Sequence, residues 1–163
     1  MSENHGLDTD QQVFFYERDF YVLSNFSAFR LRWKDFDFPT SEHAYQWEKF
    51  ADFRVASAGW SIRPRILNAP SAHEAFKIAE QNKEHVRAGW HDVRVGIMRD
   101  ILRAKAEQHE YVRRKLLATG DRELIEDSWR DAFWGWGEDK QGQNMLGKLW
   151  MEVRAELRKA GAV

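Results

Sequence analysis

Three polar residues spaced four and three positions apart, Glu42, Gln46 and Lys49, could do chemistry on one side of a helix. Residues at this spacing project from the same helix face, in a line about two turns long. The helix dipole stabilises a carboxylate in the first turn, and such a carboxylate can act as a base or stabilise a developing cation. An amine such as Lys49 can act as a nucleophile in its neutral form. The alternative is a solvated helix face with one weak ion pair.

The second candidate region is the loop from Trp129 to Gly147, which lacks the periodicity of a helix or strand. Trp134 offers a flat face on which a base can stack, a contact that contributes on the order of 1 to 3 kcal/mol. Gly135 and Gly137 allow a ligand to approach the backbone closely. Asp131 is a lone acid among aromatic residues. The pattern favours a loop that binds a base and a ribose, and the alternative is a rigid Trp-packed turn capped by Asp131.

The composition argues against several other kinds of chemistry. Cysteine is absent, which excludes disulfides, thiolate metal sites and a cysteine nucleophile. The 6 histidines form no His-x-x-x-His pair and no Glu-x-x-His motif, so we expect neither a metal ion nor a cofactor. The glycine motifs of serine hydrolases, NTPases and dinucleotide-binding folds are also missing.

The length and charge of the chain favour a single small domain. A chain of 163 residues can bury one core without disulfides or metals. Because 25 basic residues face 26 acidic ones without long runs of either sign, the sequence does not indicate a charge-driven scaffold for nucleic acid or membrane. No apolar run approaches the roughly 18 residues of a membrane span, and residues 1–12 do not resemble a signal peptide. We therefore expect a cytoplasmic protein with no membrane partner.

The elements that position these residues predict an α+β fold. We expect a mainly helical single domain with a small antiparallel sheet near the N-terminus. We expect a flexible tail over residues 1–12 and the domain over residues 13–158. Extended runs are predicted at residues 13–16 and 21–26, and alternation across the turn Lys34-Asp35 predicts a hairpin over residues 29–38.

Helix signals follow the hairpin. Thr40 or Ser41 is expected to cap a helix running to about Ala56, and residues 59–70 are expected to be irregular. The remaining predicted elements are a helix from the capping box Ser71–Glu74 to near Gly89, helices from about Asp92 and over Glu110–Ala118, a short strand at Leu124–Glu126, and a final helix capped by Asn144.

Several motifs, taken together from about Val13 to Leu157, resemble the NADAR family, whose best known branch is the YbiA-type N-glycosidases. The residues that carry the resemblance are Ser24-Asn25-Phe26, Pro39-Thr40-Ser41-Glu42-His43 with Gln46 and Lys49-Phe50, Arg87 with Trp90, Lys105 with Gln108, and the loop from Asp131 to Gly147 ending in Met151 and Arg154. They follow the order and spacing of the family.

The resemblance implies a YbiA-type α+β fold and an N-glycoside hydrolase. Its expected substrates are riboflavin-pathway aminopyrimidine ribosyl phosphates or ADP-ribosylated guanine, including ADP-ribosylated nucleic acid. The implied catalytic residues are Glu42, Lys49, Asp131 and Trp134. The residues expected to bind substrate are Ser24, Asn25, Phe26, Gln46, Arg87, Trp90, Gly135, Gly137 and Asn144. A non-catalytic module that binds ADP-ribose or a nucleotide through the Trp134 loop is the alternative.

One segment departs from the YbiA-type pattern, between Val55 and Glu84. The run Ser71–Lys77 replaces a stretch that is expected to carry Gly-Arg. Arg63, Arg65 and Arg87 are candidates to hold a substrate phosphate, with solvated surface arginine as the alternative for the first two. The nature of the bond cleaved is therefore better supported than the identity of the substrate.

Overall fold

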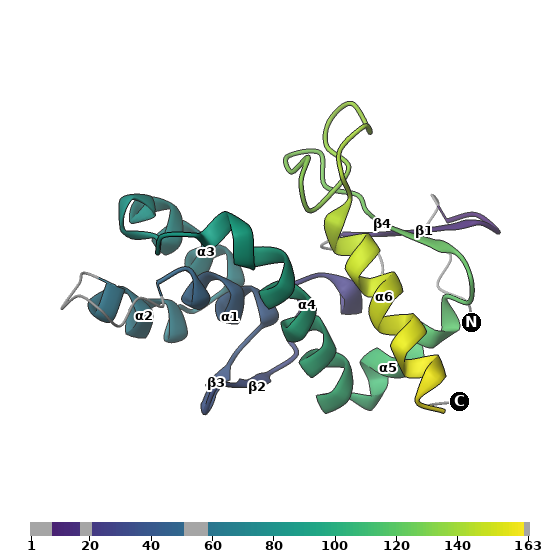
Figure 1. Ribbon diagram of the computed structural model, residues 1–163, viewed down its shortest axis with the longest axis horizontal. Coiled ribbons are helices and arrows are strands. Elements are labelled where there is room, and N and C mark those ends of the chain that lie inside the picture. Colours follow the sequence, from purple (N-terminus) through teal and green to yellow (C-terminus); the bar gives the residue numbers. More distant parts are fainter. Residues whose placement is uncertain (1–7, 17–20, 51–58, 162–163) are drawn as a thin grey trace. The chain divides into compact units, whose positions relative to one another are not determined.

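The computed structural model describes residues 8–16, 21–50 and 59–161, without the side chains of residues 59 and 60. The chain forms two compact units, one from residues 28–108 and one from residues 1–27 together with 109–163 (Figure 1). The described residues are mainly helical, with two small two-stranded sheets, one in each unit.

The unit of residues 28–108 contains the predicted hairpin. Strand β2 (Leu31–Trp33) pairs antiparallel with β3 (Phe36–Phe38). Lys34 and Asp35 between them both have positive φ, 45° and 69°, as a two-residue type I′ turn requires. The hairpin prediction is thus confirmed.

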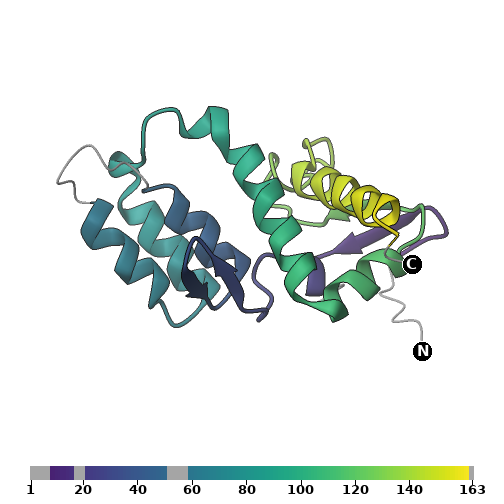
Figure 2. The same ribbon diagram turned by 60° about the horizontal axis from the view of Figure 1, so that its bottom comes forward.

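Helix α1 (Ser41–Glu48) follows the hairpin, and Thr40 caps it by accepting a hydrogen bond from the His43 N–H. All eight of its residues are buried. Its end is earlier than the predicted one near Ala56, and residues 51–58 lie outside the described part of the chain. Figure 2 shows α1 packed together with α2 and α3.

The prediction of irregular structure over residues 59–70 is wrong, because helix α2 occupies Gly59–Leu67. Pro64 lies inside this helix, where it lacks the N–H that would bond to the carbonyl of residue 60. The helix nevertheless continues, and both the backbone N–H and the side-chain amide of Asn68 donate to the Pro64 carbonyl. A proline inside a helix is unfavourable, so Pro64 argued for irregular structure in the sequence.

Helix α3 (Ala72–Gln81) begins as predicted, since the Ser71 hydroxyl accepts from the Glu74 N–H. It ends well before Gly89 because the Asn82 side chain donates to the Ile78 carbonyl and closes the last turn. The short 3-10 helix η2 (Lys83–His85) follows.

Helix α4 (Trp90–Gln108) packs against α1 and β2. The Gln108 side chain accepts from the backbone N–H of Arg32 at 2.7 Å and donates to its carbonyl at 2.8 Å. A side-chain amide therefore satisfies the free edge of β2, which accounts for Gln108 among the motif residues.

The second unit contains a pairing that the sequence analysis missed. Strand β1 (Gln12–Phe15) pairs in parallel with β4 (Glu123–Glu126), more than a hundred residues later in the chain. The predicted extended run at residues 21–26 is wrong. It forms the 3-10 helix η1 (Tyr21–Leu23) followed by turns in which the Ser24 hydroxyl accepts from the Phe26 N–H.

Of the predicted tail, residues 1–7 lie outside the described residues. Residues 8–12 form a turn in which Thr9 and Asp8 side chains accept hydrogen bonds from the backbone of Gln12 and Phe14, respectively. The tail as a whole stays a prediction.

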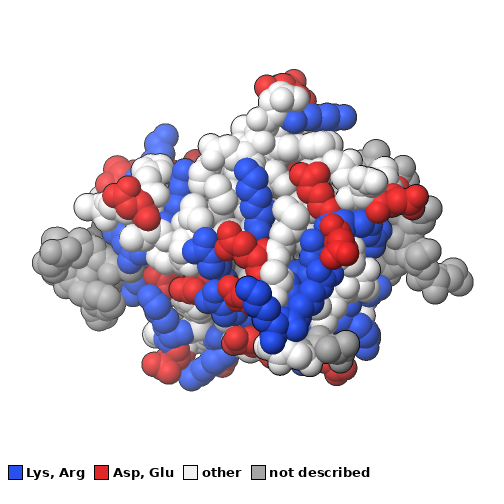
Figure 3. Space-filling view, turned by 45° about the vertical axis from the view of Figure 1, so that its right-hand side comes forward, with Lys and Arg blue, Asp and Glu red and all other residues white. Residues whose placement is uncertain are grey.

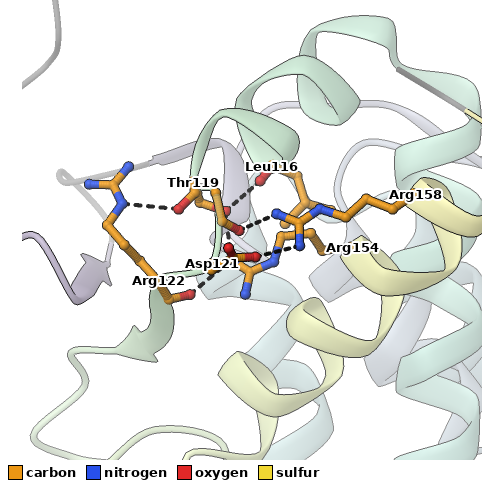
Figure 4. Close-up of polar contacts among 7 residues, drawn as sticks. Leu116, Thr119, Asp121, Arg122, Arg154 and Arg158 are labelled. Carbon is orange, nitrogen blue, oxygen red and sulfur yellow. Dashed lines mark hydrogen bonds and ion pairs between the residues drawn. The ribbon is translucent and has the colours of Figure 1, made fainter.

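Helix α5 (Glu110–Ala118) matches its prediction, and helix α6 (Met145–Lys159) lies against β4 (Figure 1). Arg154 ties α6 to the turn after α5, because its guanidinium donates to the Thr119 hydroxyl and to the Arg122 carbonyl (Figure 4). Burial and the nearby charge of Arg158 lower the pKa of Arg154, while Asp121 raises it. Arg154 thus has a structural role within this unit.

Candidate functional site

The polar stripe on α1 is buried and is not a solvated surface. Glu42 is 7% exposed and Gln46 is 2% exposed. The Gln46 Nε2 donates to Glu42 Oε1 at 2.6 Å, while Gln46 Oε1 makes no hydrogen bond with any described residue. Burying a polar acceptor without a partner costs free energy, so such an atom is suited to receive a donor from a ligand. Lys49, one turn further, is half-buried.

The start of α1 is held in place by His43, which is fully buried. Its Nε2 lies 3.0 Å from the Ala69 carbonyl and its Nδ1 lies 2.8 Å from the Thr40 hydroxyl. Because a carbonyl only accepts, Nε2 carries the proton and Nδ1 accepts from Thr40. Burial lowers the pKa of His43, an effect that the bond to Ala69 partly opposes, so the ring is neutral at pH 7. His43 thereby fixes the position of the neighbouring Glu42.

Three predicted site residues of this unit lie together at the end of α1. The Lys49 ammonium lies 5.4 Å from the centroid of the Tyr45 ring, and Tyr45 contacts Trp90 at 5.2 Å. The Arg87 guanidinium lies 5.4 Å from the Trp90 centroid, and the Arg87 N–H donates to the Lys49 carbonyl at 2.8 Å. Lys49, Arg87 and Trp90 therefore lie close together, and their contact with a substrate stays a prediction.

Glu48 is a buried charged residue that the sequence analysis did not single out. Its Oε1 accepts from the Trp33 indole at 2.7 Å and pairs with the Lys34 ammonium at 2.9 Å. Oε2 is buried and makes no hydrogen bond with a described residue. The sequence gives no signal for this residue, since its partners come from the hairpin.

Lys105 is a second buried charged residue. It is one of the residues that carry the family resemblance, but it was not expected to be part of the site. It is fully buried on α4, and its ammonium lies 5.4 Å from the Phe29 centroid. Burial lowers the pKa of Lys105 to about 7. Lys105 stands at a core-facing position in the helical pattern of α4, and this pattern could have indicated its burial.

The loop over residues 127–144 has a tightly bonded backbone. Asp131 Oδ1 accepts from the N–H groups of both Phe133 and Trp134, each at 2.8 Å. The Trp134 ring stands edge-on to Phe133 at 4.8 Å and is half-buried. Asp131 thus caps a turn, as the structural alternative proposed, and its role toward a ligand stays a prediction.

The glycines of this loop meet packing needs. A Cβ on Gly135 would lie 2.9 Å from the Asp131 carbonyl oxygen and 2.9 Å from Ser128 Cβ. Gly137 has a φ of 75°, which favours glycine. The predicted substrate contacts of both residues remain untested predictions.

The other predicted binding residues of this unit are buried or half-buried. The Asn144 side chain accepts from the Glu126 N–H at 2.9 Å and donates to the Leu124 carbonyl at 2.9 Å, and thus extends the edge of β4. Ser24 and Asn25 are buried, and Phe26 is half-buried. Their contact with substrate stays a prediction.

Three further observations concern surface charge, metal binding and membrane-spanning helices. Basic and acidic side chains are interspersed on the face shown in Figure 3. Within the described ranges, no group of three His, Asp or Glu side chains could hold a metal ion, and no helix is long and apolar enough to cross a membrane.

Comparison with known proteins places these residues in a family. The NADAR domain matches residues 14–158. The chain is 40% identical over 151 residues to a riboflavin biosynthesis protein of Vibrio vulnificus, an alignment that covers 91% of this chain and 39% of that protein. It is 37% identical over 139 residues to the N-glycosidase YbiA of Escherichia coli, covering 85% of this chain and 82% of the relative.

The fold comparison agrees with the sequence comparison. The NMR structure of E. coli YbiA superposes with a TM-score of 0.81 at 35% identity, covering 96% of this chain and 90% of that one. This confirms the predicted YbiA-type α+β fold. The chain belongs to the NADAR domain family.

Proposed function

We propose that the protein is an N-glycoside hydrolase that cleaves the bond between a ribose and a base. The observation that carries this proposal is the buried Glu42–Gln46 pair on α1, with Lys49 on the same helix face. A buried carboxylate beside an acceptor without a partner destabilises the fold. The same two groups can accept hydrogen bonds from the hydroxyls of a sugar substrate. The relatives named N-glycosidase support the same reaction class.

In one route, Glu42 acts on the sugar without a covalent intermediate. The C1–N bond breaks as positive charge develops at C1, and a carboxylate stabilises that charge or takes a proton from the attacking water. The water oxygen forms the new bond to C1, and the base leaves with a proton on its nitrogen. Glu42 lies in the first turn of α1, where the helix dipole favours its anionic form.

In the second route, Lys49 forms a covalent intermediate. Its neutral Nζ bonds to C1 as the C1–N bond to the base breaks. One Nζ proton passes to the departing base and the other to the ring oxygen as the C1–O bond opens, which leaves a Schiff base between C1 and Nζ. Water then adds to C1 and releases the sugar and the free amine. Borohydride reduction during turnover followed by mass spectrometry should show a sugar adduct on Lys49, which Lys49→Arg removes. Absence of an adduct in the wild type leaves the carboxylate route.

By the family resemblance, two further residues are proposed to take part. Trp134 offers a surface on which a base or adenine ring can stack, and Asp131 offers a carboxylate for the ribose or for water. The substrates are small phosphorylated ribosides of the riboflavin pathway or ADP-ribosylated guanine, and the site of action is the cytoplasm. The name of the Vibrio relative favours the first substrate class.

The decisive variant is Glu42→Gln, which keeps the size and removes the charge. It should lower the rate of base release by about 10² to 10⁴, the usual contribution of general acid-base catalysis. Glu80→Gln, on the exposed face of α3, is the matched control and should retain wild-type activity. Equal rates for wild type and Glu42→Gln, on both an aminopyrimidine riboside phosphate and ADP-ribosylated guanosine, would contradict the proposal. The binding-module alternative instead predicts ADP-ribose binding that Trp134→Ala abolishes, without turnover.

A further inference from the structure

Gln46 is a buried polar residue whose two amide atoms are used unequally. Its Nε2 donates to Glu42 Oε1 at 2.6 Å, while its Oε1 is buried and makes no hydrogen bond with any described residue. Because an ionised carboxylate only accepts hydrogen bonds, the amide has to present its nitrogen to Glu42, and this fixes which end of the amide is which. Among the described residues, the amide is therefore held from its nitrogen end.

Packing does not explain a glutamine at this position. All eight residues of Ser41–Glu48 are buried, and a buried acceptor without a partner costs about 1 to 3 kcal/mol. Methionine has a similar length and would fill the same space without a polar oxygen. A residue that lowers the stability of a helix interior is typical of a functional site. Compared with methionine, what glutamine adds at this position is the N–H donated to Glu42.

Two sets of contacts restrain Glu42. The neighbouring His43 is bonded to the Thr40 hydroxyl and to the Ala69 carbonyl, which anchors the first turn of α1. One turn further along the helix, Gln46 donates to the Glu42 carboxylate. The first set fixes the backbone and the second restrains the side chain. Orientation of a reacting group is a main source of catalytic rate, and a displacement of about 1 Å can lower the rate by about 10²-fold.

We propose that Gln46 is a positioning residue, which acts on catalysis through the carboxylate of Glu42. Its N–H holds one carboxylate oxygen in place and stabilises the ionised form through a charge-assisted hydrogen bond. The inference rests on the proposed N-glycoside hydrolase function, in which Glu42 stabilises the charge at C1 or takes a proton from water. It gives the nitrogen end of the amide a role of its own, apart from the predicted contact between Gln46 and substrate.

Two other roles for Gln46 lead to different expectations. If Gln46 only fills space, its loss disturbs the helix in the same way whether or not Glu42 carries a charge. If it only contacts substrate through Oε1, its loss weakens substrate binding and leaves the turnover of bound substrate unchanged. A positioning role instead requires that the effect of losing Gln46 disappears once the Glu42 carboxylate is gone.

The test is a double-mutant cycle on the full chain, made of Gln46→Met, Glu42→Gln and the variant with both changes. Base release from an aminopyrimidine riboside phosphate and from ADP-ribosylated guanosine gives kcat and KM for each protein. Gln46→Met should lower kcat by about 10- to 100-fold, the loss expected for a hydrogen bond to a charged group. In the Glu42→Gln background, the same change should alter kcat by less than about twofold.

The matched control is Gln81→Met, because Gln81 is exposed at the end of α3. It should retain the wild-type kcat and KM. Thermal melting of every variant shows whether it is folded at the assay temperature. If Gln46→Met is unfolded, Gln46→Lys decides, because lysine offers a donor to a carboxylate four residues earlier on a helix. A kcat within about tenfold of the wild type then supports the positioning role, and a larger loss in folded protein overturns it.

The outcomes separate this role from the catalytic proposal. A fall in kcat for folded Gln46→Met that vanishes in the Glu42→Gln background supports the positioning role. An unchanged kcat, a rise in KM alone, or losses that multiply when the two changes are combined overturn it, even when the wild type hydrolyses ribosides. A wild type that releases no base from either substrate overturns the N-glycoside hydrolase function itself, and the positioning role with it.

Discussion

Asn144 offers a test that distinguishes a structural residue from a substrate-binding one. Its backbone has φ 48° and ψ 45°, the left-handed region, and its side chain bonds to both Glu126 and Leu124 of β4. Asn144→Ala removes both hydrogen bonds and leaves a buried carbonyl unsatisfied, at about 1 to 3 kcal/mol, and a partly buried N–H at about 1 kcal/mol. Alanine in the left-handed region costs a further 1 to 2 kcal/mol, roughly. The free energy of unfolding should therefore fall by about 3 to 6 kcal/mol.

Asn144→Gly removes the same two bonds and tolerates the left-handed backbone. It should be more stable than Asn144→Ala by about 1 kcal/mol, a difference that the side-chain bonds cannot produce. Urea unfolding followed by circular dichroism measures both free energies, and the alanine variant should melt about 10 °C below the wild type.

The activity of the same variants decides the role of Asn144. A purely structural residue gives variants whose KM at low temperature equals that of the wild type, as long as they are folded. A substrate-binding residue gives a raised KM in folded protein. Alanine and glycine variants that both unfold within about 1 kcal/mol of the wild type would refute the structural reasoning.

Two further predictions concern stability. Burial lowers the folded-state pKa of His43 below its usual value of about 6.5, so as pH falls the unfolded chain takes up the additional proton first. The free energy of unfolding should therefore decline as pH falls below about 6.5. His43→Gln should flatten this decline in unfolding experiments at about pH 5 to 8, and an unchanged pH profile would contradict the prediction. Gly147→Ala should destabilise the fold by about 3 kcal/mol or more, since its Cβ would lie 2.0 Å from the Leu124 carbonyl oxygen. The control Gly96→Ala, where a Cβ meets nothing within 4 Å, should be neutral or stabilising by up to about 1 kcal/mol; equal melting temperatures for the two variants would show that α6 does not pack as closely on β4 as described.

The elements that the sequence predicts well are those with local signals. The hairpin is marked by alternation around Lys34-Asp35, and α3 is marked by its Ser71 cap. Each signal lies within a few residues of the structure that it specifies, so a single sequence is sufficient to find it. The parallel pairing of β1 with β4 has no such signal, because the partners are more than a hundred residues apart in the chain.

In the candidate site, too, local features could be predicted from the sequence and tertiary features could not. The spacing of Glu42, Gln46 and Lys49 predicts a shared face, but it does not reveal whether that face is solvated. Burial of Glu42 depends on what packs around α1, which is tertiary information. The contact of Arg63 with the Trp47 ring was not predicted, because Pro64 argued against the helix that carries Arg63.

The burial of α1 also determines how activity data on this protein have to be interpreted. Every residue of Ser41–Glu48 is buried, so a substitution at Glu42 or Gln46 disturbs packing as well as chemistry. Gln46 donates to Glu42 at 2.6 Å, and a variant without that donor leaves a buried carboxylate less well satisfied. Loss of activity alone therefore does not identify a catalytic residue on this helix. An isosteric Glu42→Gln variant that retains the wild-type melting temperature and loses base release does identify one, because its packing is intact and only the charge has been removed.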